Sequence, residues 1–166
     1  MTTPQKIATC FWFDTQAAEA ADFYVSLFDN SRILHTARYG KNEHGIEGSV
    51  MLVRFSLAGV EFAALNGGPV FTLSEAASLV VTCDDQAEID RLWAALLADG
   101  GTESRCGWLK DRFGMSWQII PAQLAAMMRD GDAAANARLM QALLKMVKLD
   151  IATLEAAWVG TAIASS

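Results

Sequence analysis

The sequence predicts an α+β fold: two tandem βαβββ modules that form a cupped mixed sheet, followed by C-terminal helices. An apolar strand, a helix and a hairpin occur in this order in each half of the chain. Residues 14–17 (DTQA) also match residues 84–87 (DDQA), at the same place in the two halves. We place the first module at residues 1–67, the second at 68–121 and a helical extension at 122–166, within one compact domain.

The first module begins with the apolar run "IATCFWF", which favours a strand at residues 7–13. Asp14 is predicted to cap a helix that runs to about Phe28, since the alanine-rich sequence favours helix. The predicted strands after this helix are residues 33–39, 50–57 and 60–65. The last two are joined by a tight turn at Ala58-Gly59, and the turn-rich "NGGPVF" that follows them marks the end of the module.

The second module repeats this layout. The run "SLVVTC" predicts a strand at residues 78–83, and Asp84 is predicted to cap an amphipathic helix at 85–98. The stretch "GWLKDRFGMSWQIIP" then predicts a strand, a tight turn at 111–114 and a second strand that ends at Pro121.

The C-terminal third is predicted to be helical. The predicted helices are residues 121–129, a second running from the cap Asp132 to about Lys148, and a third at 151–158 capped by Asp150. Four apolar residues form a stripe at helical spacing: Leu139, Leu143, Met146 and Val147. This stripe packs either against its own sheet or against a second copy of the chain, and methionine-containing stripes suit both.

Composition limits the class of protein. The hydrophobic fraction of 52% with 19% charged residues is typical of a packed globular chain, and no apolar run is long enough to span a membrane. The net charge of −6 argues against a general nucleic-acid-binding protein, which needs a basic surface. Three cysteines without a CxxC pair, and an N-terminus unlike a secretory signal, predict reduced thiols and a cytoplasmic location.

Four segments carry a resemblance to a known family: "FWFDTQAAEAADFYVSLFDNSRI", "LVVTCDDQAEIDRLWAALLADGG", "CGWLKDRFGMSWQIIP" and "LLKMVKLDIATLEAAW". On these segments the chain resembles the vicinal oxygen chelate superfamily, which has the glyoxalase and bleomycin-resistance fold. More narrowly, it is similar to the PhnB-like branch, whose members are often labelled 3-demethylubiquinone-9 3-methyltransferase domain proteins. The resemblance implies paired βαβββ modules and favours a homodimer.

The resemblance also implies where a metal would bind. Metal-dependent members carry one ligand on the first strand and one on the last strand of each module. Counted back from the helix aromatics, these positions are Thr9 and Ser78 on the first strands, and Ala63 and Gln118 on the last strands. Hydroxyl groups and an amide are weak ligands for a divalent cation, and alanine offers none. We therefore predict a site without metal or cofactor.

Strand alternation then predicts a cup. It places residues 9, 11 and 13 on one face with residues 78, 80 and 82, and with residues 116, 118 and 120. Such a wall suits a small, partly aromatic ligand held by a few hydrogen bonds, although the same polar groups could instead bond to backbone inside a filled barrel. The candidate ligand-binding residues are Thr9, Phe11, Ala63, Ser78, Trp108 and Gln118, with Trp108 at the mouth of the pocket.

Other conspicuous residues have structural interpretations. Trp12, Trp93 and Trp117 are predicted to lie in the core between sheets and helices. Cys10 and Cys83 are predicted to be buried against the two helices, which leaves Cys106 as the thiol to test for reactivity. The three charges at 110–112 are predicted to be solvated, the alternative being that Lys110 or Arg112 holds an anionic group.

Three functions remain open. The first is binding of a small organic molecule in a metal-free cup, without chemistry. The second is a metal-independent enzyme that uses Glu61, a carboxylate predicted to face the cup, as acid or base. The third is the methyltransferase of the family label, which is disfavoured because no glycine-rich loop of the S-adenosylmethionine-binding type occurs. Whether the protein is an enzyme is left undecided.

Overall fold

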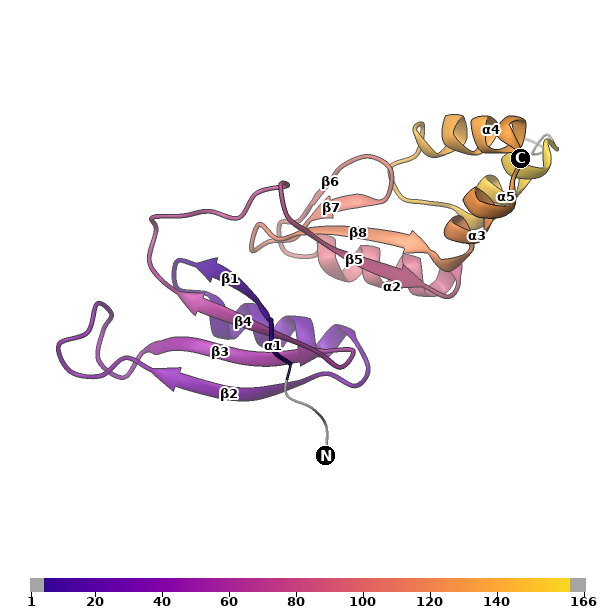
Figure 1. The fold of residues 1–166 in the computed structure, drawn as a ribbon. Helices are drawn as coiled ribbons and strands as arrows, with labels where there is room; N and C mark the ends of the chain where they lie inside the picture. The colour runs from indigo at the N-terminus through magenta and orange to yellow at the C-terminus, as the bar shows by residue number, and fades with distance from the viewer. Residues whose placement is uncertain (1–4, 162–166) are drawn as a thin grey trace. The chain divides into compact units, whose positions relative to one another are not determined.

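The structure is a computed structural model that describes residues 5–161. The chain divides between Leu73 and Ser74 into two compact units. Each unit contains a strand, a helix and three further strands, and the second unit also contains the C-terminal helices (Figure 1). The predicted α+β class with two βαβββ modules is confirmed.

The first unit is a four-stranded mixed sheet with one helix. Its elements are β1 (Thr9–Phe13), α1 (Ala17–Leu27), β2 (Arg32–Arg38), β3 (Val50–Leu57) and β4 (Val60–Asn66). The strand order is β1-β4-β3-β2, with β1 parallel to β4 and the other pairs antiparallel. The turn predicted between β3 and β4 is confirmed, because Ala58 and Gly59 both have positive φ angles, of 48° and 85°.

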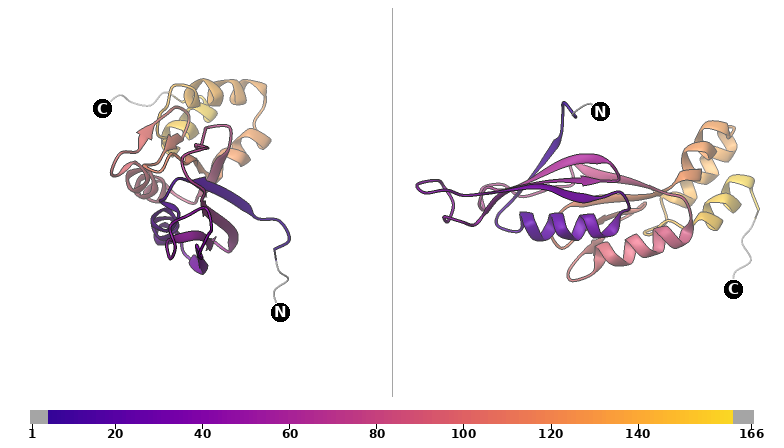
Figure 2. Two further views of the ribbon diagram at one scale, coloured as in Figure 1. Left: turned by 90° about the vertical axis from the view of Figure 1, so that its left-hand side faces the viewer. Right: turned by 90° about the horizontal axis from the view of Figure 1, so that it is seen from below.

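Helix α1 covers one face of this sheet (Figure 2), and aromatic side chains fill the interface. Tyr24 of α1 lies 6.4 Å from Phe55 of β3, between ring centroids. Phe62 of β4 stacks on Phe55 at 5.7 Å and on Phe11 of β1 at the same distance. The helix-covered face of the first sheet is therefore an aromatic core that runs across three strands.

The start of α1 is stabilised by a distant residue. The prediction that Asp14 caps the helix is wrong, because the N-cap position is Gln16, whose side chain makes no capping hydrogen bond. Instead the backbone N–H of Ala17 donates to Oδ1 of Asn66 at 2.8 Å, and Asn66 Nδ2 donates to the carbonyl of Val50 at 3.0 Å. The end of β4 thus supplies the cap that the local sequence lacks.

The second unit repeats the sheet and adds helices. Its elements are β5 (Ser78–Cys83), α2 (Gln86–Leu97), β6 (Thr102–Glu103), β7 (Trp108–Lys110), β8 (Ser116–Pro121), α3 (Ala122–Asp130), α4 (Ala133–Leu143) and α5 (Ile151–Val159). The strand order β5-β8-β7-β6 matches that of the first sheet, with β5 parallel to β8. The cap of α2 is Asp85 and not the predicted Asp84, whereas Asp132 and Asp150 cap α4 and α5 as predicted.

The turn between β7 and β8 is organised by Asp111. Its Oδ1 accepts hydrogen bonds from the backbone N–H groups of Phe113 (2.9 Å) and Met115 (3.0 Å), and its Oδ2 accepts one from Trp117 Nε1 (2.9 Å). Asp111 is only 3% exposed. The prediction that the charges of this turn are all solvated is therefore wrong for Asp111, whose carboxylate replaces water as the partner of three donors.

The C-terminal helices form their own hydrophobic cluster, which packs against Ile120 at the end of β8. Leu139 is fully buried in this cluster, and Leu143 and Met146 pack on it. These three residues therefore pack mainly against other C-terminal residues, with Ile120 as the contact to the sheet. Val147, the fourth member of the stripe, is 41% exposed.

The predicted helix to residue 148 ends at Leu143 because the following segment bonds elsewhere. The carbonyls of Met146 and Val147 accept hydrogen bonds from the N–H groups of Cys106 and Gly107, each at 2.8 Å. Gly107 has φ +81°, and a Cβ there would lie 2.8 Å from the carbonyl oxygen of Ile119. Only glycine therefore allows this close packing.

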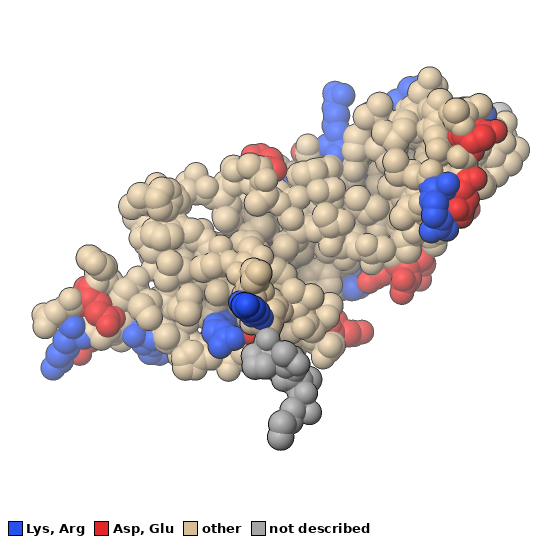
Figure 3. Space-filling model, in the orientation of Figure 1, with Lys and Arg blue, Asp and Glu red and all other residues tan. Residues whose placement is uncertain are grey.

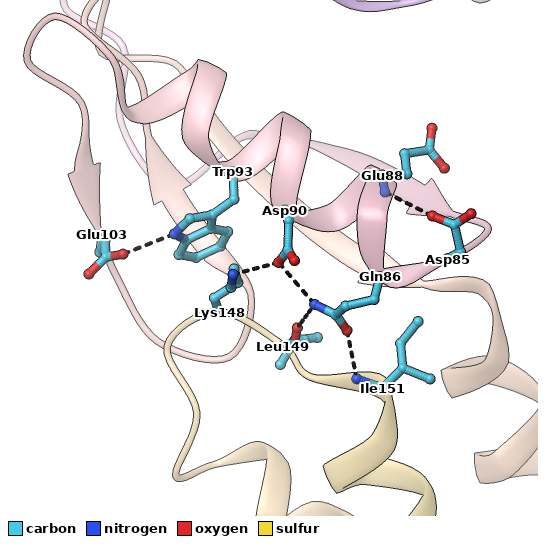
Figure 4. A network of polar contacts seen from close by, with 9 residues as sticks. All are labelled: Asp85, Gln86, Glu88, Asp90, Trp93, Glu103, Lys148, Leu149 and Ile151. Carbon is cyan, nitrogen blue, oxygen red and sulfur yellow. Dashed lines mark hydrogen bonds and ion pairs between the residues drawn. The ribbon is translucent and has the colours of Figure 1, made fainter.

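The side chain of Gln86, at the start of α2, joins the same segment to the second module (Figure 4). Its Nε2 donates to the carbonyl of Leu149 at 3.1 Å, and its Oε1 accepts from the N–H of Ile151 at 2.9 Å. Lys148 forms an ion pair with Asp90 one helical turn further along α2. The C-terminal extension is thus fastened to α2 as well as to β8.

Candidate functional site

One face of the second sheet is covered by α2, whereas the opposite face is only partly covered. Leu109, Trp117 and Ile119 point to the α2 side and are almost fully buried. Because side chains alternate along a strand and cross-strand partners share a face, the residues between them lie on the opposite side, which we call the open face of the second sheet. The registers give two rows there: Thr102, Lys110, Ser116 and Ser78 in the first, and Trp108, Gln118 and Val80 in the second.

Gln118 lies at the middle of the second row. Its Nε2 donates a hydrogen bond to Ser78 Oγ at 2.9 Å, and Trp108 is its partner in the register of β7 and β8. Val80, its partner in β5, is 59% exposed. The structure thus brings together three of the predicted ligand-binding residues, Ser78, Trp108 and Gln118, on one partly exposed surface.

A pocket of ≈170 Å³ includes Trp108 and Ser116, the register partners of Gln118 and Ser78. It is lined by Glu75, Thr102, Glu103, Ser104, Trp108, Leu109, Lys110 and Ser116. Lys110 forms an ion pair with Glu75, and this hydrogen bond from the ammonium holds the pKa of the Glu75 carboxyl below its usual value. Ser116 is 1% exposed, and its Oγ has no hydrogen-bond partner within the described chain. Trp108, predicted at the mouth of a pocket, is among these lining residues.

The first sheet presents a different set of residues from the predicted one. The parallel registers pair Cys10 with Ala63 and Val80 with Gln118, so Ala63 and Gln118 do occupy equivalent positions. Thr9, however, corresponds to Leu79 and not to Ser78, because it pairs with Phe62 on the helix-covered side. The predicted facing of Thr9 and Phe11 is wrong.

Phe11 shows the consequence of this shift most clearly. It is 5% exposed and stacks on Phe62 inside the aromatic core, so it cannot line an open cup. The predicted first-strand positions are counted back from the helices, whose lengths differ by one residue, and are therefore shifted by one residue relative to each other. A shift of one residue reverses the face of every side chain in a strand.

The same shift explains two further corrections. Trp12 is not a core residue between sheet and helix: it is half-buried, donates from Nε1 to the carbonyl of Gly68 at 2.8 Å, and meets Phe71 edge-on at 5.0 Å. Cys10, predicted to be buried, is exposed. Cys83 is buried as predicted, and its desolvation raises the pKa of the thiol to about 12.

Glu61, the candidate acid or base, lies on the first sheet beside Ser56. Its side chain is 31% exposed and its Oε2 lies 2.6 Å from Nη2 of Arg54. The carboxylate is therefore engaged by a guanidinium in a partly solvated setting, and is not an isolated group in an apolar pocket.

The residues at the equivalent strand positions do not fit a divalent cation. Ala63 and Val80 have no donor atoms, the amide nitrogen of Gln118 is directed at Ser78, and Cys10 offers a single thiol whose pKa is raised by burial. Across residues 5–161, no group of three or more His, Cys, Asp or Glu side chains is close enough together to hold a metal ion. The chemistry of this donor set differs from the carboxylate and imidazole ligands that such ions prefer.

The sequence of this chain matches that of a known protein family. The model of the family described as 3-demethylubiquinone-9 3-methyltransferase matches residues 5–120. The chain belongs to this family. The matched region includes both sheets and ends at the last strand, so α3, α4 and α5 lie beyond it. No curated protein matches the sequence.

Solved structures show the same fold. A putative 3-demethylubiquinone-9 3-methyltransferase, PhnB protein, from Bacillus cereus is 39% identical, with 71% of this chain and 100% of that chain covered and a TM-score of 0.66. The protein PA1353 from Pseudomonas aeruginosa is 20% identical over 71% and 98% of the two chains, with a TM-score of 0.58. The fosfomycin resistance protein FosX from Mesorhizobium loti is 14% identical over 77% and 99%, with a TM-score of 0.52. The predicted resemblance to PhnB-like proteins is confirmed by the first of these structures, and the other two show the same fold.

On the face drawn in Figure 3, basic and acidic side chains are scattered, without a broad basic patch. Within the described part of the chain, no helix has both the length and the apolar character required to cross a membrane.

Proposed function

We propose that this family member binds a small, partly aromatic organic molecule on the open face of the second sheet, at a site without metal. The observation that carries the proposal is the pairing of Gln118 with Ser78 beside Trp108, at the edge of the ≈170 Å³ pocket. An indole surface for a planar ring, with a few placed polar groups, is the usual composition of a small-molecule site.

Binding is favoured over acid–base catalysis because the Glu61 carboxylate is already engaged in an ion pair with Arg54. A general base must be within hydrogen-bond reach of the proton that it removes. If Glu61→Gln leaves turnover of a candidate substrate unchanged, Glu61 has no acid–base role. A fall in turnover without a change in ligand affinity would instead support the enzyme alternative.

We do not extend the methyltransferase label of the family to an activity of this chain. Each of the two sheets combines one parallel pair of strands with antiparallel pairs. A doubly wound parallel sheet, on which S-adenosylmethionine is typically bound at a glycine-rich turn, has a different topology. An assay with S-adenosylmethionine and a quinone precursor tests the label directly.

A homodimer and a cytoplasmic location are proposals that rest on the family resemblance and the reduced thiols. Native mass spectrometry of the purified protein tests the first, since it separates monomer from dimer. The same spectrum tests the proposal of a metal-free site: a mass equal to that of the bare polypeptide supports it, and a bound divalent ion would contradict it.

The binding site is tested by NMR on the indole N–H groups of the five tryptophans. Benzamide, a neutral planar probe, is expected to shift the Trp108 signal, which Trp108→Phe identifies by its loss. The Trp117 signal is the matched internal control, because this indole is buried on the other face and bonded to Asp111. If neither benzamide nor a charged ring of the same shape moves the Trp108 signal, the proposed site is wrong.

A further inference from the structure

Ser116, which lines the pocket, has a hydroxyl group that makes no hydrogen bond within the described chain. Ser116 is 1% exposed, and its Oγ has no partner within residues 5–161. Its neighbour in the row, Ser78, is by contrast bonded to Gln118. A buried polar group without a hydrogen-bond partner lowers stability and is uncommon in native structures. We therefore expect this hydroxyl to bond to an acceptor or donor from outside the chain.

A lysine occupies the next position in the same row of the sheet. Lys110 is the cross-strand partner of Ser116 on the open face, and its ammonium is paired with Glu75, which lies in the connection before β5. The side chain of Glu75 is 65% exposed and that of Lys110 is 34% exposed. An ion pair of this exposure contributes little to stability, so another carboxylate can replace that of Glu75 at small cost.

We propose that the pocket receives a small aromatic carboxylate, whose carboxylate group displaces Glu75 from Lys110 and accepts a hydrogen bond from Ser116 Oγ. The ring then lies against Trp108. In the absence of ligand, Glu75 occupies the place of the ligand's carboxylate. This inference rests on the proposed function, because it names the chemical class that the same site binds.

The remaining charge of the pocket is compatible with an anionic ligand. Glu103 lines the pocket, but its Oε1 accepts a hydrogen bond from Trp93 Nε1 at 2.9 Å. Its register partner is Leu109, a residue of the helix-covered side. Of the three charged residues that line the pocket, Lys110 is the one that can pair with an anion.

The volume of the pocket limits the size of the ligand. At ≈170 Å³ it is smaller than the pockets of roughly 300 Å³ or more that hold drug-sized molecules. A single ring with one carboxylate is a suitable probe, and benzoate and benzamide have nearly the same shape but differ in charge.

The experiment compares the dissociation constants of benzoate and benzamide by NMR titration of the Trp108 indole signal. Benzoate is expected to bind more tightly than benzamide. Glu75→Gln should tighten benzoate binding by about threefold, because it removes a competitor whose ion pair is of the weak, exposed kind, and it should leave benzamide unchanged. Lys110→Met should weaken benzoate binding by about tenfold or more, as expected for loss of a charged hydrogen bond.

One control variant and one further site variant separate this proposal from a general loss of structure. Arg112→Met removes a neighbouring charge that is directed at Asp99 and Phe113, and it should not change benzoate affinity. Ser116→Ala keeps the size of the side chain small and should weaken benzoate a few-fold, with the spectrum of the folded protein retained.

The outcomes distinguish the two proposals. If benzamide shifts Trp108 but benzoate binds no better, or if Glu75→Gln has no effect on benzoate, the carboxylate inference is wrong and the ligand site stands. If neither probe moves the Trp108 signal in the native chain or in Glu75→Gln, both proposals are wrong.

Discussion

The two sheets have the same strand order and the same parallel and antiparallel pairs, yet their uncovered sides differ in chemistry. At equivalent positions the first sheet has Cys10 beside Ala63, and the second has Val80 beside Gln118. On the first sheet, Arg54 and Glu61 form a solvent-accessible ion pair with each other. The second leaves a pocket with a buried, unpaired hydroxyl.

This difference shows which properties the backbone repeat determines. The repeated topology determines which positions can meet across a sheet, and hence where a site can form. The side chains at those positions decide whether a site is present. Substitutions and thiol labelling can test how far the two modules differ in stability and in chemistry.

The largest expected effect is on the second hairpin. Asp111→Ala removes a buried carboxylate that accepts from two backbone N–H groups and from Trp117, and we expect a loss of about 3 kcal/mol or more in the free energy of unfolding. The equivalent turn of the first module, Ala58-Gly59, has no buried carboxylate: its N–H groups donate to Ser31 Oγ and to the carbonyl of Asn30. Urea denaturation measures the loss, with Arg112→Ala as the control. A loss below about 1 kcal/mol would contradict the structural role of Asp111.

The next effect concerns the helix caps. Asn66→Ala leaves the buried N–H of Ala17 without an acceptor, at a cost of about 2 kcal/mol. Asp85→Ala removes a cap that accepts from Glu88 at an exposed position, at a cost of about 1 kcal/mol. Thermal and chemical denaturation of the two variants compare these costs. Equal losses would show that the long-range cap of α1 is worth no more than the local cap of α2.

The thiols provide a chemical comparison of the two modules. Burial raises the pKa of Cys83 to about 12. Almost none of this thiol is therefore present at pH 8 as thiolate, which is the reactive form. Burial also raises the pKa of Cys10, but this residue is exposed. We therefore expect iodoacetamide to label Cys10 at least tenfold faster, with a rate that rises with pH. Peptide mass mapping reads out the sites, and equal rates in denaturant are the control.

The smallest expected effect comes from Gln118→Ala, which places alanine at the position that corresponds to Ala63. The variant loses the hydrogen bond to Ser78, and since the pair is partly exposed we expect a cost of about 1 kcal/mol or less. Benzamide binding should weaken a few-fold. If affinity and stability both stay unchanged, the difference between the two sheets at this position has no consequence for the site.

Much of the fold could be predicted, but the facing of the first strand could not. Helix α2, the hairpin of β3 and β4 and the caps Asp132 and Asp150 follow from local patterns and were placed to within a residue or two. Strand β1 is apolar along its whole length, so its sequence does not show which side is buried. Thr9 and Phe11 were therefore assigned to the wrong face.

The candidate site was predicted in part for a related reason. Gln118 and Trp108 stand out because they are unusual in their strands. Ser116 and Lys110 do not, since a serine or a lysine near a turn is ordinary in any sequence. Their importance depends on burial and on the approach of Glu75 from a connecting segment, which only the folded chain shows.

The sequence by itself determined the α+β class, the two modules and most element boundaries, because hydrophobic periodicity, turn residues and helix caps act over a few neighbouring residues. The tertiary structure alone decided three further features. They are the cap of α1 by Asn66, the anchoring of the C-terminal segment by Gln86, and the pocket in which Lys110 and Ser116 meet. Each depends on contacts between residues far apart in the chain, which no local pattern encodes.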